Sequence, residues 1–218
     1  MRFFSPFLFL CIMFKENKID AIIFDLGGVI LNLNYQLTID AFRSLGIEDF
    51  DKMYTQAKQN DLFDRFEMGQ ISSQHFINSL LPFLPKSTSP NHVVKAWNAM
   101  ILDFPIERLN LLDSLREKYR IFLLSNTNDI HLQAVRRSLV KTTERSLESY
   151  FETTYVSHEM YMRKPNLDIF KSVCSENKLN PSSTLFIDDT IGHIEGAKNM
   201  GLITHHLTNG QVIEELFK

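Results

Sequence analysis

The sequence predicts an α/β fold: a doubly wound, Rossmann-like parallel sheet with a small helical domain inserted after its first strand. Short apolar runs alternate with amphipathic, helix-favouring stretches over most of the chain, as in folds built from strand–helix units. The apolar runs also lack the period of two that a half-exposed strand shows. This is typical of parallel strands that helices cover on both faces.

Five apolar runs are the expected strands. Sheets of this kind bind ligands beyond the carboxyl ends of their strands, so the residues at those ends are the first candidates for a site. The candidates there are Asp25, Ser125 with Asn126, Asp188 with Asp189, and Lys164 shortly after the third run. The five runs cover residues 19–26, 119–126, 151–160, 183–190 and 202–208.

Residues 32–102 interrupt the strand pattern, and we expect them to form a helical cap. The segment carries amphipathic, helix-favouring sequence, and Pro105 beyond it disfavours helix at the preceding residue. The expected helices lie in 36–46, 72–84 and 91–102. The predicted catalytic core therefore comprises residues 19–31 and 103–218.

Residues 1–18 are an apolar N-terminal extension with a run from Phe3 to Phe14. The run resembles the core of a signal peptide, but at ~1.5 Å per residue it is too short to span a hydrocarbon layer of ~30 Å, and no small-residue cleavage site follows it. We favour a natural start at Met13, with a real targeting or membrane-surface segment as the alternative. No membrane partner is expected unless this segment is genuine.

Composition excludes several classes of function. The formal net charge is −3 and no long run of Lys or Arg occurs, so nucleic acid is not an expected partner. The two cysteines, Cys11 and Cys174, lie far apart without metal-site spacing. A disulfide framework is thereby excluded, and a reducing compartment such as the cytoplasm is the expected location. Nothing in the sequence indicates an oligomeric state.

Four short motifs follow one another at the predicted strand ends. They read FDLGGVI at 24–30, LLSNTN at 123–128, RKP at 163–165 and FIDD at 186–189. Together they resemble the ordered motifs of the haloacid dehalogenase-like hydrolase superfamily, over nearly the whole chain from Ile19 onward. Within it, the combination resembles the branch that contains alpha-D-glucose-1-phosphate phosphatases.

The resemblance implies a Mg²⁺-dependent phosphatase that acts on a small phosphorylated metabolite, such as a hexose 1-phosphate, through an aspartyl-phosphate. Asp25 would be the nucleophile, a role that suits a carboxylate because it is ionised at neutral pH. Mg²⁺ prefers oxygen ligands and keeps several waters. Its expected ligands are Asp25, Asp189 and the backbone carbonyl of Gly27, with Asp188 as a further ligand or a neighbour of the ligands.

The resemblance also assigns phosphate and substrate contacts. Ser125 and Asn126 would bind phosphate at a strand-to-helix turn, where backbone donors are free. Lys164 would add a compact positive charge beside the phosphate and the nucleophile. Arg163 is either part of the site or an exposed neighbour. In the cap, the candidates for substrate contact are Asp64, Arg65 and Glu67, each with a solvated helix face as the alternative.

Two positions depart from the pattern. Gly27 stands where many members of the superfamily have an aspartate that protonates the leaving oxygen, a contribution typically worth about 10²–10⁴-fold in rate. A sugar 1-phosphate partly escapes this loss, because its anomeric oxygen is a better leaving group than a plain alkoxide. His193 replaces a residue that is usually asparagine in the branch. We expect it to cap the helix that begins there, with donation to an active-site carboxylate as the alternative.

Two other functions stay open at this stage. A 2-haloacid dehalogenase also attacks through an aspartate and lacks the second acid, but its chemistry needs no metal, and Asp188 with Asp189 argues against it. A catalytically impaired member could instead bind a phosphorylated ligand or a partner. Gly27 and His193 are the residues that motivate this reading.

Overall fold

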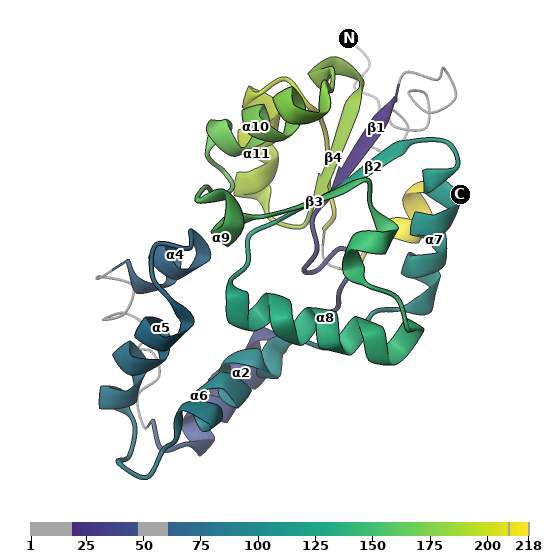
Figure 1. Cartoon of the computed structure of the whole chain (residues 1–218). Coiled ribbons are helices and arrows are strands. Elements are labelled where there is room, and N and C mark those ends of the chain that lie inside the picture. The colour runs from purple at the N-terminus through teal and green to yellow at the C-terminus, as the bar shows by residue number, and fades with distance from the viewer. Residues whose placement is uncertain (1–18, 48–60, 209, 218) are drawn as a thin grey trace.

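Five parallel strands form the centre of the protein, and they confirm the predicted fold class. The computed structural model describes residues 19–47, 61–208 and 210–217, so the N-terminal extension and Cys11 lie outside the described residues. The strands are β1 (Ala21–Phe24), β2 (Arg120–Ser125), β3 (Thr153–Val156), β4 (Thr184–Asp188) and β5 (Ile203–His206). Their order in the sheet is β3-β2-β1-β4-β5 (Figure 1).

The central position of β1 places its last residues in the middle of the sheet edge. Phe24 pairs with Leu123 of β2 on one side and with Ile187 of β4 on the other. The next residues along β1 and β4, Asp25 and Asp188, are therefore neighbours. The Asp25 N–H continues the ladder by donating to the Ile187 carbonyl at 2.9 Å.

The strand predicted over 151–160 is wrong in its second half. β3 ends at Val156, and Ser157–Met160 form the short helix α9. The Ser157 hydroxyl explains the change of direction, because its Oγ accepts a hydrogen bond from the Thr127 N–H at 2.9 Å. This bond holds the start of α9 against the chain that leaves β2.

Two apolar layers cover the sheet. Alternate residues of β1 pack into the two layers, with Ile22 and Phe24 in one and Ala21 and Ile23 in the other. This is expected of a strand that is buried on both faces. The first layer is made by α7 (Ile106–Arg116), α8 (Asp129–Thr143) and the 3₁₀ helices η3 (Leu147–Tyr150) and η5 (Ile213–Phe217). The second is made by α10 (Leu167–Asn177), with Cys174 buried in it, and α11 (Ile191–Asn199).

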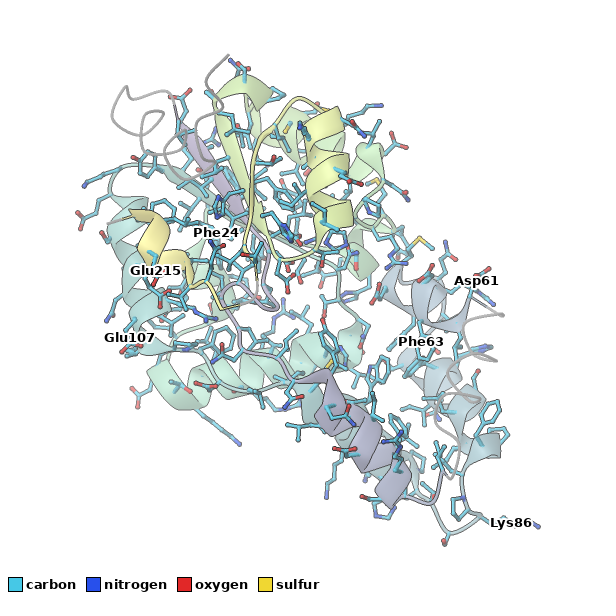
Figure 2. All side chains as sticks on the ribbon, turned by 180° about the vertical axis from the view of Figure 1, so that it is seen from behind. Phe24, Asp61, Phe63, Lys86, Glu107 and Glu215 are labelled. Carbon is cyan, nitrogen blue, oxygen red and sulfur yellow. The ribbon has the colours of Figure 1, made fainter. Side chains whose placement is uncertain are left out.

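The described part of the segment 32–102 consists of helices that share a hydrophobic core, to which Ile130 of α8 also contributes. Phe76 lies at its centre and stacks on Phe66 with ring centroids 4.3 Å apart. Figure 2 shows Phe63 among these helices and Phe24 in the sheet. The helices are α2 (Tyr35–Ser44), α4 (Leu62–Glu67), α5 (Ser73–Leu80), α6 (Pro90–Trp97), η1 (Leu81–Phe83) and η2 (Asn98–Met100). Among all the helices described, none is both long and apolar enough for a membrane span.

The chain enters and leaves the cap along one pair of backbone segments. The Asn32 N–H donates to the Asp103 carbonyl at 3.0 Å, and the Leu102 N–H donates to the Asn32 carbonyl at 3.1 Å. One step further into the cap, Leu33 and Ile101 form an antiparallel bridge. This pair connects the cap to the carboxyl end of β1, next to Asp25.

Replacing Phe76 by alanine is expected to lower the free energy of unfolding by about 3–5 kcal/mol, because a fully buried ring leaves a cavity behind. Phe76 is 0% exposed, whereas Phe83 in η1 is 38% exposed, and Phe83→Ala should cost less than about 1 kcal/mol. Denaturant titration can follow Trp97, the one tryptophan of the chain, whose ring centroid lies 4.8 Å from that of Phe76. Equal costs for the two variants would contradict the central place of Phe76.

Candidate active site

A fully buried lysine lies at the carboxyl edge of the sheet. Lys164 is 0% exposed. Its Nζ donates to Asp25 Oδ1 at 2.7 Å, to Asp188 Oδ2 at 2.7 Å and to the Leu124 carbonyl at 2.9 Å. All three of its protons therefore have acceptors, and the ammonium joins the ends of β1, β2 and β4.

The charges of this cluster shift one another's pKa values. Burial acts to lower the pKa of Lys164, but the charges of Asp25 and Asp188 outweigh it and hold the pKa above its usual value. Burial raises the pKa of Asp25 to about 6, although Lys164 acts against the shift. For Asp188, burial is outweighed by Lys164 and His193, and the pKa is lowered. The lysine therefore stays charged and favours the ionised form of both carboxylates.

A third carboxylate completes a possible cation site. Asp25, Asp188 and Asp189 offer oxygens that lie within 4.8 Å of one another. Three carboxylates and the single ammonium of Lys164 leave a charge of −2, which a divalent cation would neutralise. The donor set consists of hard oxygen ligands, as Mg²⁺ prefers, and therefore fits the ion that the sequence predicts.

Gly28 makes room for the Asp189 carboxylate. Its φ of +73° is in the left-handed region, and a Cβ at this position would lie 2.2 Å from Asp189 Oδ2. The turn is closed by the Gly28 N–H, which donates to the Leu31 carbonyl at 2.8 Å. The second glycine of the GG pair is thus required both by the backbone conformation and by the approach of the acid.

Asp188 faces three donor groups of the protein. Besides the bond from Lys164, its Oδ1 accepts from the Thr190 N–H at 2.8 Å, and the ring Nδ1 of His193 lies 3.1 and 3.0 Å from Oδ1 and Oδ2. Asp25 and Asp189 have fewer protein donors, and whether Asp188 is itself a ligand or a neighbour of the ligands stays open. Asp188 orients the lysine beside Asp25.

The prediction that His193 caps its own helix is wrong. Thr190 is the residue before α11, and no side chain caps that end. The His193 ring turns instead to the fully buried Asp188, because an ionised carboxylate in the interior needs hydrogen-bond donors. The alternative considered for His193, donation to an active-site carboxylate, describes its actual contact.

Asn126 holds Lys164 in place through its side-chain amide. Asn126 Nδ2 donates to the Lys164 carbonyl at 2.9 Å, and the Lys164 N–H donates to Asn126 Oδ1 at 2.9 Å. This reciprocal pair engages one N–H of the side-chain amide, and phosphate binding by Asn126 stays a prediction. Ser125, 3% exposed, lines the adjacent cavity, and its role as a phosphate ligand stays a prediction.

An arginine that the sequence left ambiguous joins the cap to the core. The Arg163 guanidinium forms ion pairs with Asp64 and, at 2.9 Å, with Glu67 Oε2. Next to it, the Ser157 hydroxyl donates a hydrogen bond to the Glu67 carbonyl at 2.6 Å. Arg65 is exposed on the same helix. We call the group of Arg163, Asp64 and Glu67 the clasp. The sequence offered one indication of this contact. Asp64 and Glu67 are three residues apart, and this spacing places both carboxylates on one face of a helix, where they can pair with the same cation.

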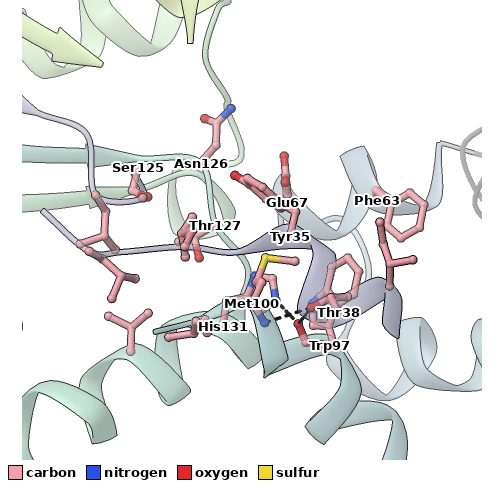
Figure 3. Close-up of a pocket in the computed structure, with 17 residues that line it drawn as sticks. Tyr35, Thr38, Phe63, Glu67, Trp97, Met100, Ser125, Asn126, Thr127 and His131 are labelled. Atoms are coloured by element: carbon pink, nitrogen blue, oxygen red, sulfur yellow. Dashed lines mark hydrogen bonds between the residues drawn. The ribbon is translucent and has the colours of Figure 1, made fainter. Parts of the chain in front are cut away.

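A cavity of about 510 Å³ lies between the clasp, the sheet edge and the first turn after β1. In Figure 3, Asn126, Glu67 and Tyr35 lie toward one side and Trp97 and His131 toward the other. Asp64 and Arg65, predicted as substrate contacts, are not among the residues that line it. The lining residues are Leu26, Gly27, Leu31, Leu33, Tyr35, Thr38, Ile39, Phe63, Glu67, Trp97, Met100, Ile101, Ser125, Asn126, Thr127, His131 and Val135.

The wall at Gly27 is apolar. A Cβ at Gly27 would lie 2.5 Å from Leu33 Cδ1, so the leucine fills the space where the side chain of an acid at position 27 would begin. The floor is aromatic: Trp97 stacks on Phe63 at 5.6 Å and on His131 at 4.9 Å between ring centroids. The cavity thus places a large apolar surface beside the charged cluster.

Comparison with known proteins decides the family. A model of the family described as haloacid dehalogenase-like hydrolase matches residues 19–201. The chain belongs to this family. The match confirms the superfamily that the four motifs indicated, while the glucose-1-phosphate phosphatase branch stays a prediction.

Two relatives from Bacteroides thetaiotaomicron cover most of this hydrolase. A D-ribitol-5-phosphate phosphatase is 28% identical over 192 residues, which are 88% of this chain and 93% of the relative. The solved structure of a haloacid dehalogenase family enzyme, in complex with magnesium and inorganic phosphate, is 35% identical, with a TM-score of 0.85 over 92% of this chain and 100% of that one. The L-2-haloacid dehalogenase of Xanthobacter autotrophicus shares the fold, with a TM-score of 0.58 at 20% identity over 87% of this chain and 77% of its own.

Gly28→Ala is expected to weaken Mg²⁺ binding by about 10–100-fold, because the new methyl group would displace the Asp189 carboxylate from its place. Isothermal titration calorimetry with Mg²⁺ alone measures this. Gly192→Ala is the matched control, since a Cβ there meets no atom within 4 Å, and its Mg²⁺ affinity should equal that of the wild type. Unchanged affinity in Gly28→Ala would contradict Asp189 as a ligand.

Proposed function

We propose that this hydrolase is a Mg²⁺-dependent phosphatase for a small phosphorylated sugar or sugar alcohol, working through an aspartyl-phosphate on Asp25. The observation that carries the proposal is the contact between Asp25 and the buried Lys164, at 2.7 Å, beside a cavity large enough for such a molecule. A carboxylate nucleophile held by a fixed cation suits attack on a phosphate dianion, which repels negative charge.

Asp25 and Asp189 would hold the Mg²⁺, with the Gly27 carbonyl as a further oxygen ligand. When bound, the ion neutralises charge on the transferring phosphoryl group. Lys164 would stabilise the same charge while it orients the Asp25 carboxylate. Asp188 keeps the ammonium fixed, so little reorganisation is needed when the phosphoryl group arrives.

A hexose 1-phosphate is the first candidate substrate. With Leu33 in the space beside Gly27, no acid at that position protonates the leaving oxygen, so a substrate with a weakly basic leaving oxygen is favoured. A sugar-alcohol phosphate is the second candidate, because one relative is named a D-ribitol-5-phosphate phosphatase. Its leaving group is a primary alkoxide, and its turnover would require a proton from elsewhere in the cavity.

The competing functions are less well supported. A 2-haloacid dehalogenase would leave Asp189 and the charge of the cluster without a use, and the solved dehalogenase at 20% identity shares the fold alone. Gly27 favours a catalytically impaired protein that only binds its ligand. Against this, the contacts of Lys164 and His193 show that the charged cluster is intact. A phosphorylated small molecule is the proposed partner, and the cysteine usage fits action in the reducing cytoplasm.

Phosphate release from a panel of sugar phosphates should require Mg²⁺ and stop with EDTA or in Asp25→Asn. The panel includes glucose 1-phosphate and ribitol 5-phosphate, with released phosphate as the measurement. Asp20→Asn is the control and should keep full activity, because Asp20 is exposed and lies just before β1, at the opposite end of the strand from Asp25. Chloride release from 2-chloropropionate without metal would identify a dehalogenase. No turnover, with a sugar phosphate still raising the unfolding temperature, would favour the binding protein.

Gly27→Asp requires the Leu33 side chain to turn aside, because a Cβ at position 27 would lie 2.5 Å from Leu33 Cδ1. Combined with Leu33→Ala, it should raise turnover of ribitol 5-phosphate by at least about tenfold, since a general acid typically contributes about 10²–10⁴-fold. Glucose 1-phosphate, with its better leaving oxygen, should gain less. The single variant Leu33→Ala is the control, and an equal gain for both substrates would contradict the leaving-group argument.

A further inference from the structure

Phosphoryl transfer to Asp25 releases an alcohol, and its oxygen needs a proton. At neutral pH, a group is an effective donor when its pKa lies near the working pH. Gly27 offers no such group, so the donor has to come from another wall of the cavity. Among the described lining residues, the titratable side chains are Tyr35, Glu67 and His131.

His131 is already committed on both ring nitrogens. Its Nε2 lies 3.0 Å from the Trp97 carbonyl and therefore carries the proton, while Nδ1 lies 3.1 Å from the Asn128 amide nitrogen and accepts. Burial lowers the pKa of His131 to about 4. The ring is thus a neutral structural link between α8 and the end of α6.

Tyr35 holds its proton too tightly to exchange it in each cycle. Partial burial and the charges of Asp189 and Asp25 raise the pKa of its phenol to about 12. Its hydroxyl can donate a hydrogen bond to a substrate oxygen, but releasing the proton at neutral pH is unfavourable by several powers of ten. Glu67 is the group that remains.

Glu67 reaches the cavity from the last turn of α4. Its Oε2 lies 2.9 Å from Arg163 Nη2, and its backbone carbonyl is held by Ser157 Oγ at 2.6 Å. Its side chain is 29% exposed. The ion pair therefore holds the carboxyl group at Oε2, and Glu67 lines the cavity together with Gly27 and Ser125.

The charges around Glu67 come from three directions. Arg163 and Lys164 act to lower the pKa of Glu67, and Asp64 acts to raise it, but burial is the largest influence and the net shift is upward. Tyr35 faces it from α2. A carboxyl group with a raised pKa is better suited to exchanging protons near neutral pH than one in water.

We propose that Glu67 is the proton-transfer residue that replaces the acid missing at position 27. This inference rests on the proposed phosphatase function. In the first half-reaction, an Asp25 oxygen bonds to phosphorus, the bond from phosphorus to the alcohol oxygen breaks, and the Glu67 proton moves to that oxygen. In the second, a water oxygen bonds to phosphorus, its proton returns to Glu67, and the bond from phosphorus to Asp25 breaks. The products are alcohol and phosphate, and both carboxyl groups return to their starting states.

The clasp itself supplies a matched control. Asp64 and Glu67 pair with the same guanidinium and lie on the same helix face, but Glu67 lines the cavity and Asp64 does not. Asp64→Asn and Glu67→Gln therefore each replace one carboxyl group of the clasp by an amide of similar size. They differ in whether they remove a carboxyl group that can reach the substrate.

The test measures kcat/KM for three substrates in both variants and the wild type: p-nitrophenyl phosphate, glucose 1-phosphate and ribitol 5-phosphate. This ratio reports the steps up to loss of the alcohol, where the leaving group matters. Glu67→Gln should lower kcat/KM by about 10²-fold or more for ribitol 5-phosphate and less for glucose 1-phosphate. For p-nitrophenyl phosphate, whose leaving group needs no proton, the loss should stay below about threefold. Asp64→Asn should change each value by less than about threefold.

Other outcomes overturn the inference. Equal losses for all three substrates in Glu67→Gln, or the same losses in Asp64→Asn, would mean that Glu67 only holds the cap. Thermal unfolding of both variants within a few degrees of the wild type shows that the comparison concerns folded protein. If the wild type releases no phosphate from any substrate, the proposed function fails. If it does and Glu67→Gln is unaffected, the proton-transfer role alone fails.

Discussion

The ammonium of Lys164, enclosed between Asp25 and Asp188, is the interaction on which the rest of the site depends. A charge removed from water is costly unless opposite charges and hydrogen-bond acceptors replace its hydration. Here two carboxylates and one backbone carbonyl do so, all within 2.9 Å. Because these acceptors end three different strands, the lysine aligns the strand ends. The Asn126 amide and the His193 ring then stabilise this arrangement from the periphery.

The strand ends could be predicted because each polar candidate follows an apolar run, and runs of this kind form parallel sheets with their ends at one edge. Asp25, Asp188 and Lys164 meet there for that reason. Which atoms pair could not be predicted, since it depends on side-chain directions in segments far apart in the sequence. Arg163 reaches back to the cap, and the Asn126 amide turns to the lysine backbone.

The glycine pair shows how two identical residues differ in physical role. Gly28 is needed for its positive φ and for the close approach of Asp189, whereas Gly27 faces the side chain of Leu33. The core therefore contributes the nucleophile, the cation ligands and the lysine. At the position of the usual acid it has an apolar wall instead. Under the proposed function, the cap then supplies more than a cover. The two parts of the protein would divide the chemistry, with phosphoryl transfer assigned to the core and proton transfer to α4.

The cap is attached to the core in two unlike ways. On one side, the two chain segments around Asn32 and Leu102 connect the cap to the core covalently, and backbone hydrogen bonds join them to each other. On the other side, the clasp is ionic, and Asp64 in it is half-exposed, with 53% of its side chain accessible. Dissolved salt weakens exposed ion pairs far more than buried ones. Ionic strength therefore weakens the ionic attachment of the cap, while the buried contacts of Lys164 are screened much less.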